Sequence, residues 1–434
     1  MSEIMDHGAG TPRVKSPQRD QVEFRAASWN DLLPDDHQAR IVWQYVLGLD
    51  LSKLYQRIKA VERHAGQSAI DPRILFALWL YATLRGIGSA RELDRRCHRQ
   101  TGEIPFQWIC GGVSVNYHTL TDFRTQHTGL LDEIFTGSIA TLLEQKLVTL
   151  DRVAQDGMKV RASAGAASFR RKPTLEEHLA DAREQIEALK KELTSDPTAG
   201  NRRQRAARER AARQREERLV KALEQMQLVE AQKKGQEAKD NARVSTTDPE
   251  ARVMKMADGG FRPAYNVQLA TDTATQIITG IDVTNSGGDQ GQLAPMVEQH
   301  EERYDETPKE MLVDGGYTKK DDITQVSAPE GNTVVYAPVQ KSKKEDVDPH
   351  TPRDDDSPAV AEWRQRMATP EAKEIYKERA ATAECVNAQA RNRGLYQVRV
   401  RGGPKVKAVV LWYVLAHNLL RVAAMRAALA ESEL

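Results

Sequence analysis

The spacing of apolar residues changes along this chain, and the changes limit the folds it can adopt. From about residue 29 to residue 147 the apolar residues recur at helical spacing, and residues 72–85 read as a nearly continuous apolar helix. Beyond residue 240 the spacing becomes two, which predicts strands. Apolar residues alternate on both sides of a TDTATQ turn: Tyr265, Val267, Leu269, Ile277, Ile281 and Val283. This pattern predicts a β-hairpin, and a mixed α/β domain that follows a helical one.

The helical region contains one candidate for DNA binding. A Gly-Ile-Gly at 86–88 ends the apolar helix, and Ser89 followed by Glu92 predicts a capping box for the next helix. Two helices joined in this way fit a helix-turn-helix, but a plain helical bundle fits them at least as well. A further helical stretch over residues 119–147 closes the region.

Residues 175–240 read as an insertion of two helical arms. The first arm has an apolar seam at alternating spacings of four and three: Leu175, Leu179, Ala182, Ile186, Leu189 and Leu193. The breaker SDPTAGN separates it from a weaker seam: Leu219, Leu223, Met226 and Val229. The run RRQRAARERAARQR in the second arm holds seven arginines and one glutamate. It fits contact with a DNA backbone and a solvated helix face about equally well.

Composition and local sequence argue against a structural zinc protein, a secreted protein and a membrane protein. The formal charge of +1 provides no global attraction to DNA, but 29% charged residues allow strongly basic local faces. The three cysteines, Cys97, Cys110 and Cys385, have no paired spacing and fit no common zinc site. Because the N-terminus lacks an apolar secretory core and the stretch AVVLWYVLAHNLL is short for a bilayer span, we expect a soluble cytoplasmic protein.

Three carboxylates carry the strongest chemical signal. Asp156 in VAQDGMKV and Asp314 in MLVDGGYT each follow a short apolar, strand-like run, and Glu384 lies on a predicted helix. Each Asp-Gly alone is ordinarily a turn. Converging carboxylates, however, are the hard oxygen ligands that suit a pair of Mg²⁺ ions about 4 Å apart, which can cleave phosphodiesters. Nucleic acid is therefore the first substrate class to test.

Together with the series Tyr376, Arg379, Glu384 and Arg391, the segments around the two aspartates resemble the DDE transposases of bacterial insertion sequences. The resemblance runs from about residue 24 to the C-terminus and includes DLLPDDHQAR, RELDRRC and FRPAYNVQ. Two positions depart from the family pattern: Arg391 stands where Lys is usual, and Met158 follows Asp-Gly where Thr is common. Arg and Lys both bind phosphate, but with different geometry.

The resemblance implies a ribonuclease H-like catalytic domain, an α/β fold with a mixed sheet flanked by helices. We expect a disordered tail at 1–20, an all-helical DNA-binding domain at 21–147 and a catalytic domain in two pieces, 148–174 and 241–434. An antiparallel coiled-coil hairpin at 175–240 is inserted between the first two strands. A polar stretch at 340–357 predicts a mobile loop, and one helix from about 359 to 391 carries Glu384.

The resemblance assigns catalysis and metal binding to Asp156, Asp314 and Glu384, with Mg²⁺ or Mn²⁺ as the cofactor. It also implies that the protein recognises terminal inverted repeats, inserts them into target DNA, and acts as a homodimer that holds two ends together. Strand cleavage and strand transfer would use one site, without a covalent protein intermediate.

The helix that carries Glu384 also offers DNA contacts. On one continuous helix Tyr376, Glu384 and Arg391 fall within an arc of about 80°, with Arg379 about 60° outside it. We expect Arg379 and Arg391 to hold phosphates and Tyr376 to contact the backbone or a base. The alternative is pairing of Glu and Arg along the helix with a buried Tyr376. Lys159 is a weaker candidate for phosphate contact.

Two other functions compete with this interpretation. Tyr376 could be the nucleophile of a tyrosine-type recombinase, although three carboxylates have no role in that chemistry. The chain could also be a domesticated, inactive DNA-binding protein on the same fold, although its intact acidic triad argues against that. Asp258, Asp289 and the pair Asp321 and Asp322 resemble ligands too, but they fit turn and helix-cap roles better.

Overall fold

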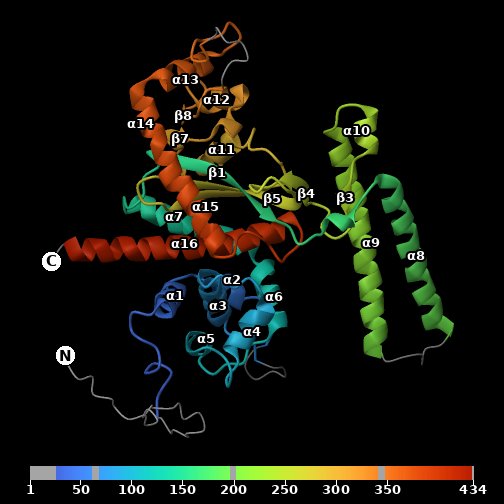
Figure 1. Ribbon diagram of the computed structural model, residues 1–434. Helices are drawn as coiled ribbons and strands as arrows, with labels where there is room; N and C mark the ends of the chain where they lie inside the picture. The colour runs from blue at the N-terminus through green and yellow to red at the C-terminus, as the bar shows by residue number, and fades with distance from the viewer. Residues whose placement is uncertain (1–25, 61–67, 196–201, 341–347, 433–434) are drawn as a thin grey trace, which may run out of the picture.

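The computed structural model describes residues 26–60, 68–195, 202–340 and 348–432. The helices of residues 38–126 lie on one side of a long C-terminal helix, and the sheet lies on the other side (Figure 1). Two long helices extend from the sheet domain as a separate arm. The disordered tail expected at 1–20 lies outside the described residues, as does most of the first half of the loop expected at 340–357.

The N-terminal region is entirely helical over its described residues. Its helices are α1 (Gln38–Leu47), α2 (Ser52–Tyr55), α3 (Pro72–Leu84), α4 (Ala90–Cys97), α5 (Ile104–Cys110), α6 (Tyr117–Gln126) and α7 (Thr128–Glu144). The predicted cap of α4 is present, because the Ser89 side chain accepts a hydrogen bond from the Glu92 backbone N–H. Glu92 does not complete the capping box, since its carboxylate pairs with Arg95 and Arg96. The single helical stretch expected at 119–147 is wrong, because His127 separates α6 from α7.

The main sheet is mixed, with strand order β4-β5-β1-β7-β8 and β6 paired to β5. Its strands are β1 (Arg152–Arg161), β4 (Arg252–Lys255), β5 (Phe261–Asp272), β6 (Ile278–Thr284), β7 (Glu310–Leu312) and β8 (Val334–Tyr336). β1 is antiparallel to β5 and parallel to β7, and β7 is parallel to β8. The predicted β-hairpin is confirmed as β5 and β6, which pair antiparallel.

The inserted segment leaves the sheet after β1 and returns before β4. It comprises η1 (Ala166–Ser168), β2 (Phe169–Arg170), α8 (Lys172–Ser195), α9 (Arg202–Ala231), α10 (Gln236–Asp240) and β3 (Val244–Ser245). β2 and β3 pair antiparallel at its base. α8 and α9 pack through seam residues, of which Leu175, Leu219 and Met226 are buried. Two packed helices are therefore present, while their coiled-coil geometry stays a prediction.

The remaining helices cover the sheet. They are α11 (Leu293–Tyr304), η2 (Gly315–Tyr317), α12 (Lys320–Val326), α13 (Pro358–Ala368), α14 (Pro370–Arg379), η3 (Ala380–Glu384), α15 (Cys385–Asn392) and α16 (Gly403–Ser432). The one helix expected from about 359 to 391 is wrong in its continuity. Thr369, in extended backbone before Pro370, separates α13 from α14, and η3 is a π-helical turn.

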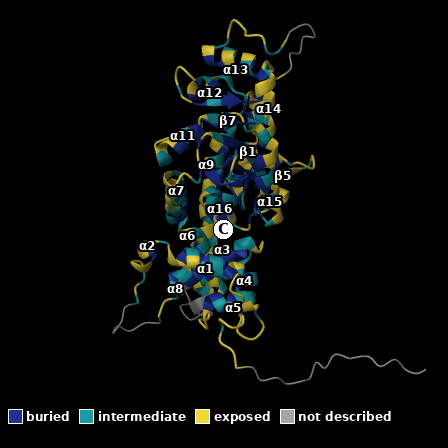
Figure 2. Cartoon of the chain, turned by 90° about the vertical axis from the view of Figure 1, so that its left-hand side faces the viewer, coloured by how far each residue is buried: buried dark blue, intermediate teal, exposed yellow. Residues whose placement is uncertain are grey.

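The helix α16 joins the two halves of the protein. It is long and apolar enough to cross a membrane, but two thirds of its most apolar stretch is buried inside the protein. Seen along its axis, it lies between the N-terminal helices and the sheet (Figure 2). Its polar residues dock on β6: the Asn418 amide donates to the Ile278 carbonyl at 2.8 Å and accepts from the Ile278 N–H at 2.9 Å. One hydrophobic cluster consequently runs from the N-terminal helices through α16 to one face of the sheet. α16 is therefore a core helix.

Two buried histidines should make this core sensitive to acid. Burial lowers the pKa of both His300 and His417 to about 4. An unfolded histidine titrates near pH 6.5, so between these values the unfolded chain binds protons that the folded chain does not, and stability falls as pH falls. We expect the melting temperature to drop between pH 6.5 and pH 4, with up to about 3 kcal/mol lost per histidine.

Thermal melts across this pH range test the expectation. His300→Gln should flatten the dependence, whereas His118→Gln, at an exposed position, should leave it unchanged. Equal pH dependence in the wild type and His300→Gln would show that His300 is not responsible.

Candidate active site

The strand register brings two of the predicted carboxylates together. Ala154 of β1 pairs with Leu312 of β7 in a parallel ladder, and each aspartate follows two residues later. Because residues two apart on a strand share a face, Asp156 and Asp314 lie side by side beyond the paired segment. Asp314 also accepts a hydrogen bond from the Gly316 N–H at 2.7 Å, which fixes the start of η2.

Arg379 connects all three predicted catalytic carboxylates. Its Nη2 lies 3.1 Å from Asp156 Oδ1 and 3.8 Å from Asp314 Oδ2. Its Nη1 lies 3.4 Å from Glu384 Oε1. The structure therefore gathers residues from β1, from the end of β7 and from η3 around one guanidinium.

The electrostatics of this cluster follow from burial and crowding. The Asp156 side chain is only 17% exposed, and burial raises its pKa, against the lowering effect of Arg379. The neighbouring charge of Asp314 raises the pKa of Asp156 further. Burial acts against the charged form of Arg379 too, but the surrounding carboxylates hold its pKa above the ordinary value. The site is thus an excess of negative charge around one cation.

The π-helical turn changes which helix residues face the site. Arg379 was expected outside the arc of the other three, yet it is the residue among the carboxylates. Tyr376 is partly buried against the core beside them, and burial raises its pKa. Arg391 is exposed, and within the described part of the chain no ion pair to it is recorded. The pairing of Glu and Arg along the helix, which is the alternative prediction, is observed between Arg379 and Glu384.

Two further predicted positions lie on β1. Lys159 Nζ is 4.0 Å from Asp289 Oδ2, so this lysine borders the acidic site without touching the three carboxylates. Met158, where the family commonly has Thr, is fully buried and belongs to the core. The position of Met158 therefore makes no polar contact at the site.

Asp289 is a fourth carboxylate beside the site, at a position where the sequence predicts a turn or cap role. Its backbone carbonyl does accept in a turn, from the Gln292 N–H, but its side chain lies against β5. Asp289 Oδ1 accepts hydrogen bonds from Asn266 at 2.7 Å and from Gln268 at 2.8 Å. Both amides are fully buried. The segment FRPAYNVQ carries the sequence signal for this contact, because its polar residues alternate with apolar ones in a strand that is otherwise buried.

Asp258 and Asp322 fit the local roles expected of them. Asp258 accepts from the Gly260 N–H in a turn and pairs with Arg262. Asp322 lies in the first turn of α12 and pairs with Lys319. Neither residue contacts the three carboxylates.

Asn387 is a second residue of the site that the sequence patterns do not predict. Its Nδ2 donates to Asp156 Oδ2 at 2.9 Å, and the side chain comes from α15, one turn beyond Glu384. Asn387 Oδ1 is buried and has no hydrogen-bond partner. An orphaned buried oxygen beside three carboxylates calls for a cation or a water.

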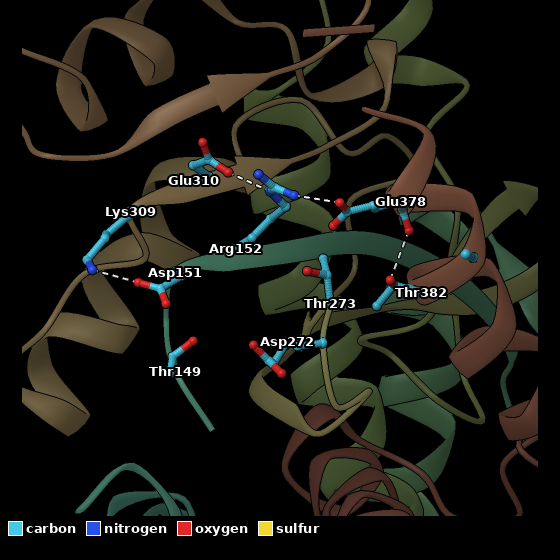
Figure 3. Close-up of a pocket in the computed structure, with 11 residues that line it drawn as sticks. Thr149, Asp151, Arg152, Asp272, Thr273, Lys309, Glu310, Glu378 and Thr382 are labelled. Atoms are coloured by element: carbon cyan, nitrogen blue, oxygen red, sulfur yellow. Dashed lines mark hydrogen bonds and ion pairs between the residues drawn. The ribbon is translucent and has the colours of Figure 1, made fainter. Parts of the chain in front are cut away.

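A second group of charges fixes the elements that carry the site. Arg152, at the start of β1, lies 2.5 Å from Glu310 of β7 and 2.5 Å from Glu378 of α14. These residues line a cavity of about 740 Å³ at the amino end of β1 (Figure 3). Lys309 also pairs with Asp151 there, so both cations that line the cavity are paired. The Arg152 ion pairs hold β1, β7 and α14 together, and they leave no unpaired cation in the cavity for an anionic ligand.

The chemistry of the acidic cluster fits magnesium. Carboxylate and amide oxygens are the ligands that Mg²⁺ prefers, and Asn387 offers an unpaired one. Among the described residues, no three His, Cys, Asp or Glu side chains are close enough to share an ion. The three carboxylates are instead gathered around Arg379.

The fold and this site define an α/β protein with a carboxylate cluster at the edge of its sheet. Two family matches identify it further: residues 27–126 match a transposase domain (DUF772), and residues 341–423 match a transposase DDE domain. Searches of curated proteins and of solved structures found no match. The resemblance to the DDE transposases of insertion sequences is confirmed, and the chain carries the domain of a DNA-cleaving enzyme family.

The matches cover some site residues and not others. Tyr376, Arg379, Glu384 and Arg391 lie within the second match. Asp156 and Asp314 lie outside both, so their assignment depends on the geometry and on the resemblance of their motifs.

The acidic site leaves no room for a side chain at Gly157. A Cβ there would lie 2.1 Å from Asp289 Oδ1 and 2.6 Å from Gln268 Nε2. Gly157→Ala should therefore displace Asp289 and destabilise the protein by about 1–3 kcal/mol. Thermal melts test this, with Gly288→Ala as the control, because a Cβ at Gly288 meets nothing within 4 Å. Equal losses in both variants would contradict the close packing at Gly157.

Proposed function

We propose that this chain is the transposase of a bacterial insertion sequence, which binds the element ends and catalyses DNA strand cleavage and strand transfer. The observation that carries the proposal is the gathering of Asp156, Asp314 and Glu384 around Arg379. It occurs in a chain whose two ends match transposase domains. We expect the protein to act in the cytoplasm on nucleoid DNA.

The sheet supports a ribonuclease H-like catalytic domain. A central strand, β1, has an antiparallel neighbour on one side and two parallel strands, β7 and β8, on the other. Asp156 lies on the central strand and Asp314 follows its parallel neighbour, at the end of the strands where ligands bind in α/β sheets. The domain boundaries 21–147, 148–174 with 241–434, and 175–240 belong to the same proposal.

The three carboxylates would hold two Mg²⁺ or Mn²⁺ ions. When bound, these ions supply activation of a water or a 3′-hydroxyl and stabilise the leaving 3′-oxygen in an in-line displacement. Asn387 orients Asp156 through its hydrogen bond to Oδ2. Asp314 is oriented by the Gly316 N–H.

The cations near the site would bind the DNA backbone. Arg379 already lies among the acidic groups, within reach of a phosphate that enters them. Arg391 and Lys159 would contact phosphates farther from the reacting bond, and Tyr376 would contact the backbone or a base. The α9 arginines are partly engaged within the arm, since Arg213 pairs with Glu209 and Arg215 with Gln185. A homodimer that synapses two ends remains our expectation.

Conservative amides should separate metal binding from folding. Asp156→Asn, Asp314→Asn and Glu384→Gln each remove an anionic oxygen at nearly constant shape, so each should lower strand cleavage about a thousandfold or more. End binding and melting temperature should change little. The measurement is cleavage of DNA that carries the flanks of the encoding gene.

The control for this experiment is Asp321→Asn, since Asp321 is an exposed aspartate in the first turn of α12, outside the cluster. It should cleave at the wild-type rate. Near-wild-type cleavage by any one of the three amide variants would remove that residue from the active site. A wild-type protein that binds ends without cleaving them would favour the inactive DNA-binding alternative.

The covalent alternative makes an opposite prediction about Tyr376. Under the proposed chemistry activity requires Mg²⁺ or Mn²⁺, and no adduct between protein and DNA survives denaturation. Reactions with and without EDTA, followed by denaturing electrophoresis, measure both properties. A denaturation-resistant adduct that Tyr376→Phe abolishes would favour a tyrosine-type recombinase instead.

A further inference from the structure

Three arginines meet where the N-terminal helices contact the catalytic domain. Arg124 comes from α6, and Arg393 and Arg399 come from the segment between α15 and α16. All three line one small cavity, together with the α3–α4 turn at Gly86 and Gly88. Residues separated by more than 250 positions thus form one basic pocket.

Carboxylates are missing from this pocket. Across the described chain none of the three arginines has an ion pair, and the one hydrogen bond from their side chains is that of Arg124 Nη1 to the Gly88 carbonyl at 2.7 Å. Arg124 Nε and Arg393 Nη1 are buried without a partner. Burial, followed by repulsion from Arg399, lowers the pKa of Arg124 to about 10. Arg124 and Arg393 are only partly buried, and Arg399 is exposed, so the pocket is open to solvent at Arg399. The two buried nitrogen atoms without a partner are costly unless an anion meets them.

The pocket is small and closely packed. Gly86 and Gly394 both have positive φ, and a Cβ on Gly394 would lie 3.2 Å from the Gly86 carbonyl oxygen, so the two turns pack directly. Arg124 is fixed from behind by the Trp79 ring, whose centroid lies 4.6 Å from its Cζ. The cavity has about 40 Å³ of space. This is room for about three waters, which suits a single phosphate group and not a nucleoside.

We propose that Arg124, Arg393 and Arg399 form a binding site for one backbone phosphate of the DNA end, built jointly by the two domains. The inference rests on the proposed function, since it takes DNA as the ligand. Arginine donors match phosphate oxygens in geometry and charge. Arg393 follows Glu384 by nine residues of mostly helical chain, which is about 14 Å and places the site within a few nucleotide steps of the carboxylates.

Binding of end DNA by the full chain, measured in EDTA so that no strand is cut, tests the site. Arg393→Gln and Arg399→Gln should each weaken binding about tenfold and lower the slope of log Kd against log salt by about one. Arg124→Lys, which keeps the charge but loses the fork, should weaken binding while preserving the slope. Arg426→Gln removes one exposed arginine at the far end of α16 and should match the wild type. Affinities and slopes of the Arg393 and Arg399 variants equal to those of Arg426→Gln would overturn the proposal.

Inorganic phosphate separates DNA from a free anion as the ligand. Phosphate could raise the melting temperature of the wild type but not of the Arg393→Gln/Arg399→Gln double variant, while the double variant still binds DNA ends like the wild type. That result would assign the pocket to a free anion and overturn the DNA assignment. Loss of end binding in these variants would support the site even if the amide variants of the three carboxylates still cleaved DNA. In that case the proposed active site alone would fail.

Discussion

The register of β1 determines the geometry of the acidic site. β1 pairs with β5 along most of its length and with β7 at its start, so its residues fix the level of both neighbours. The ion pairs of Arg152 with Glu310 and Glu378 hold β7 and α14 against the amino end of β1. A slip of one residue in β1 would move Asp156 to the opposite face and separate it from Asp314.

Charge crowding at the site is tolerated because one arginine is shared. Like-charged carboxylates at this distance repel, and burial of Asp156 adds to the free-energy cost of its ionised form. Arg379 offsets part of this cost through three pairs, and the buried amides of Asn266 and Gln268 stabilise Asp289 nearby. Such a site favours binding of further cations over stability of the folded chain, which is a common compromise at active sites.

Sequence patterns predicted the parts of this structure that local physics decides. Alternation gave the β5–β6 hairpin, Ser89 gave a helix start, and helical seams gave the α8–α9 arm. The convergence of Asp156, Asp314 and Glu384 came from motif resemblance, because no local rule brings distant residues together. The π-helical turn and the role of Asp289 were missed. Both depend on tertiary packing: one extra residue in a helical turn, and a Gly157 that admits a carboxylate by lacking a Cβ.

The continuity of the core has a consequence for how DNA would reach the carboxylates. The N-terminal helices, α16 and the sheet share one hydrophobic cluster, and Gly86 packs on Gly394 at the boundary. The N-terminal region is therefore not a tethered module that searches for DNA independently. If it holds the element end as we propose, a phosphate fixed between the two domains sets the distance from the bound sequence to the cleaved bond. Catalysis then gains from positioning that exists before the DNA arrives.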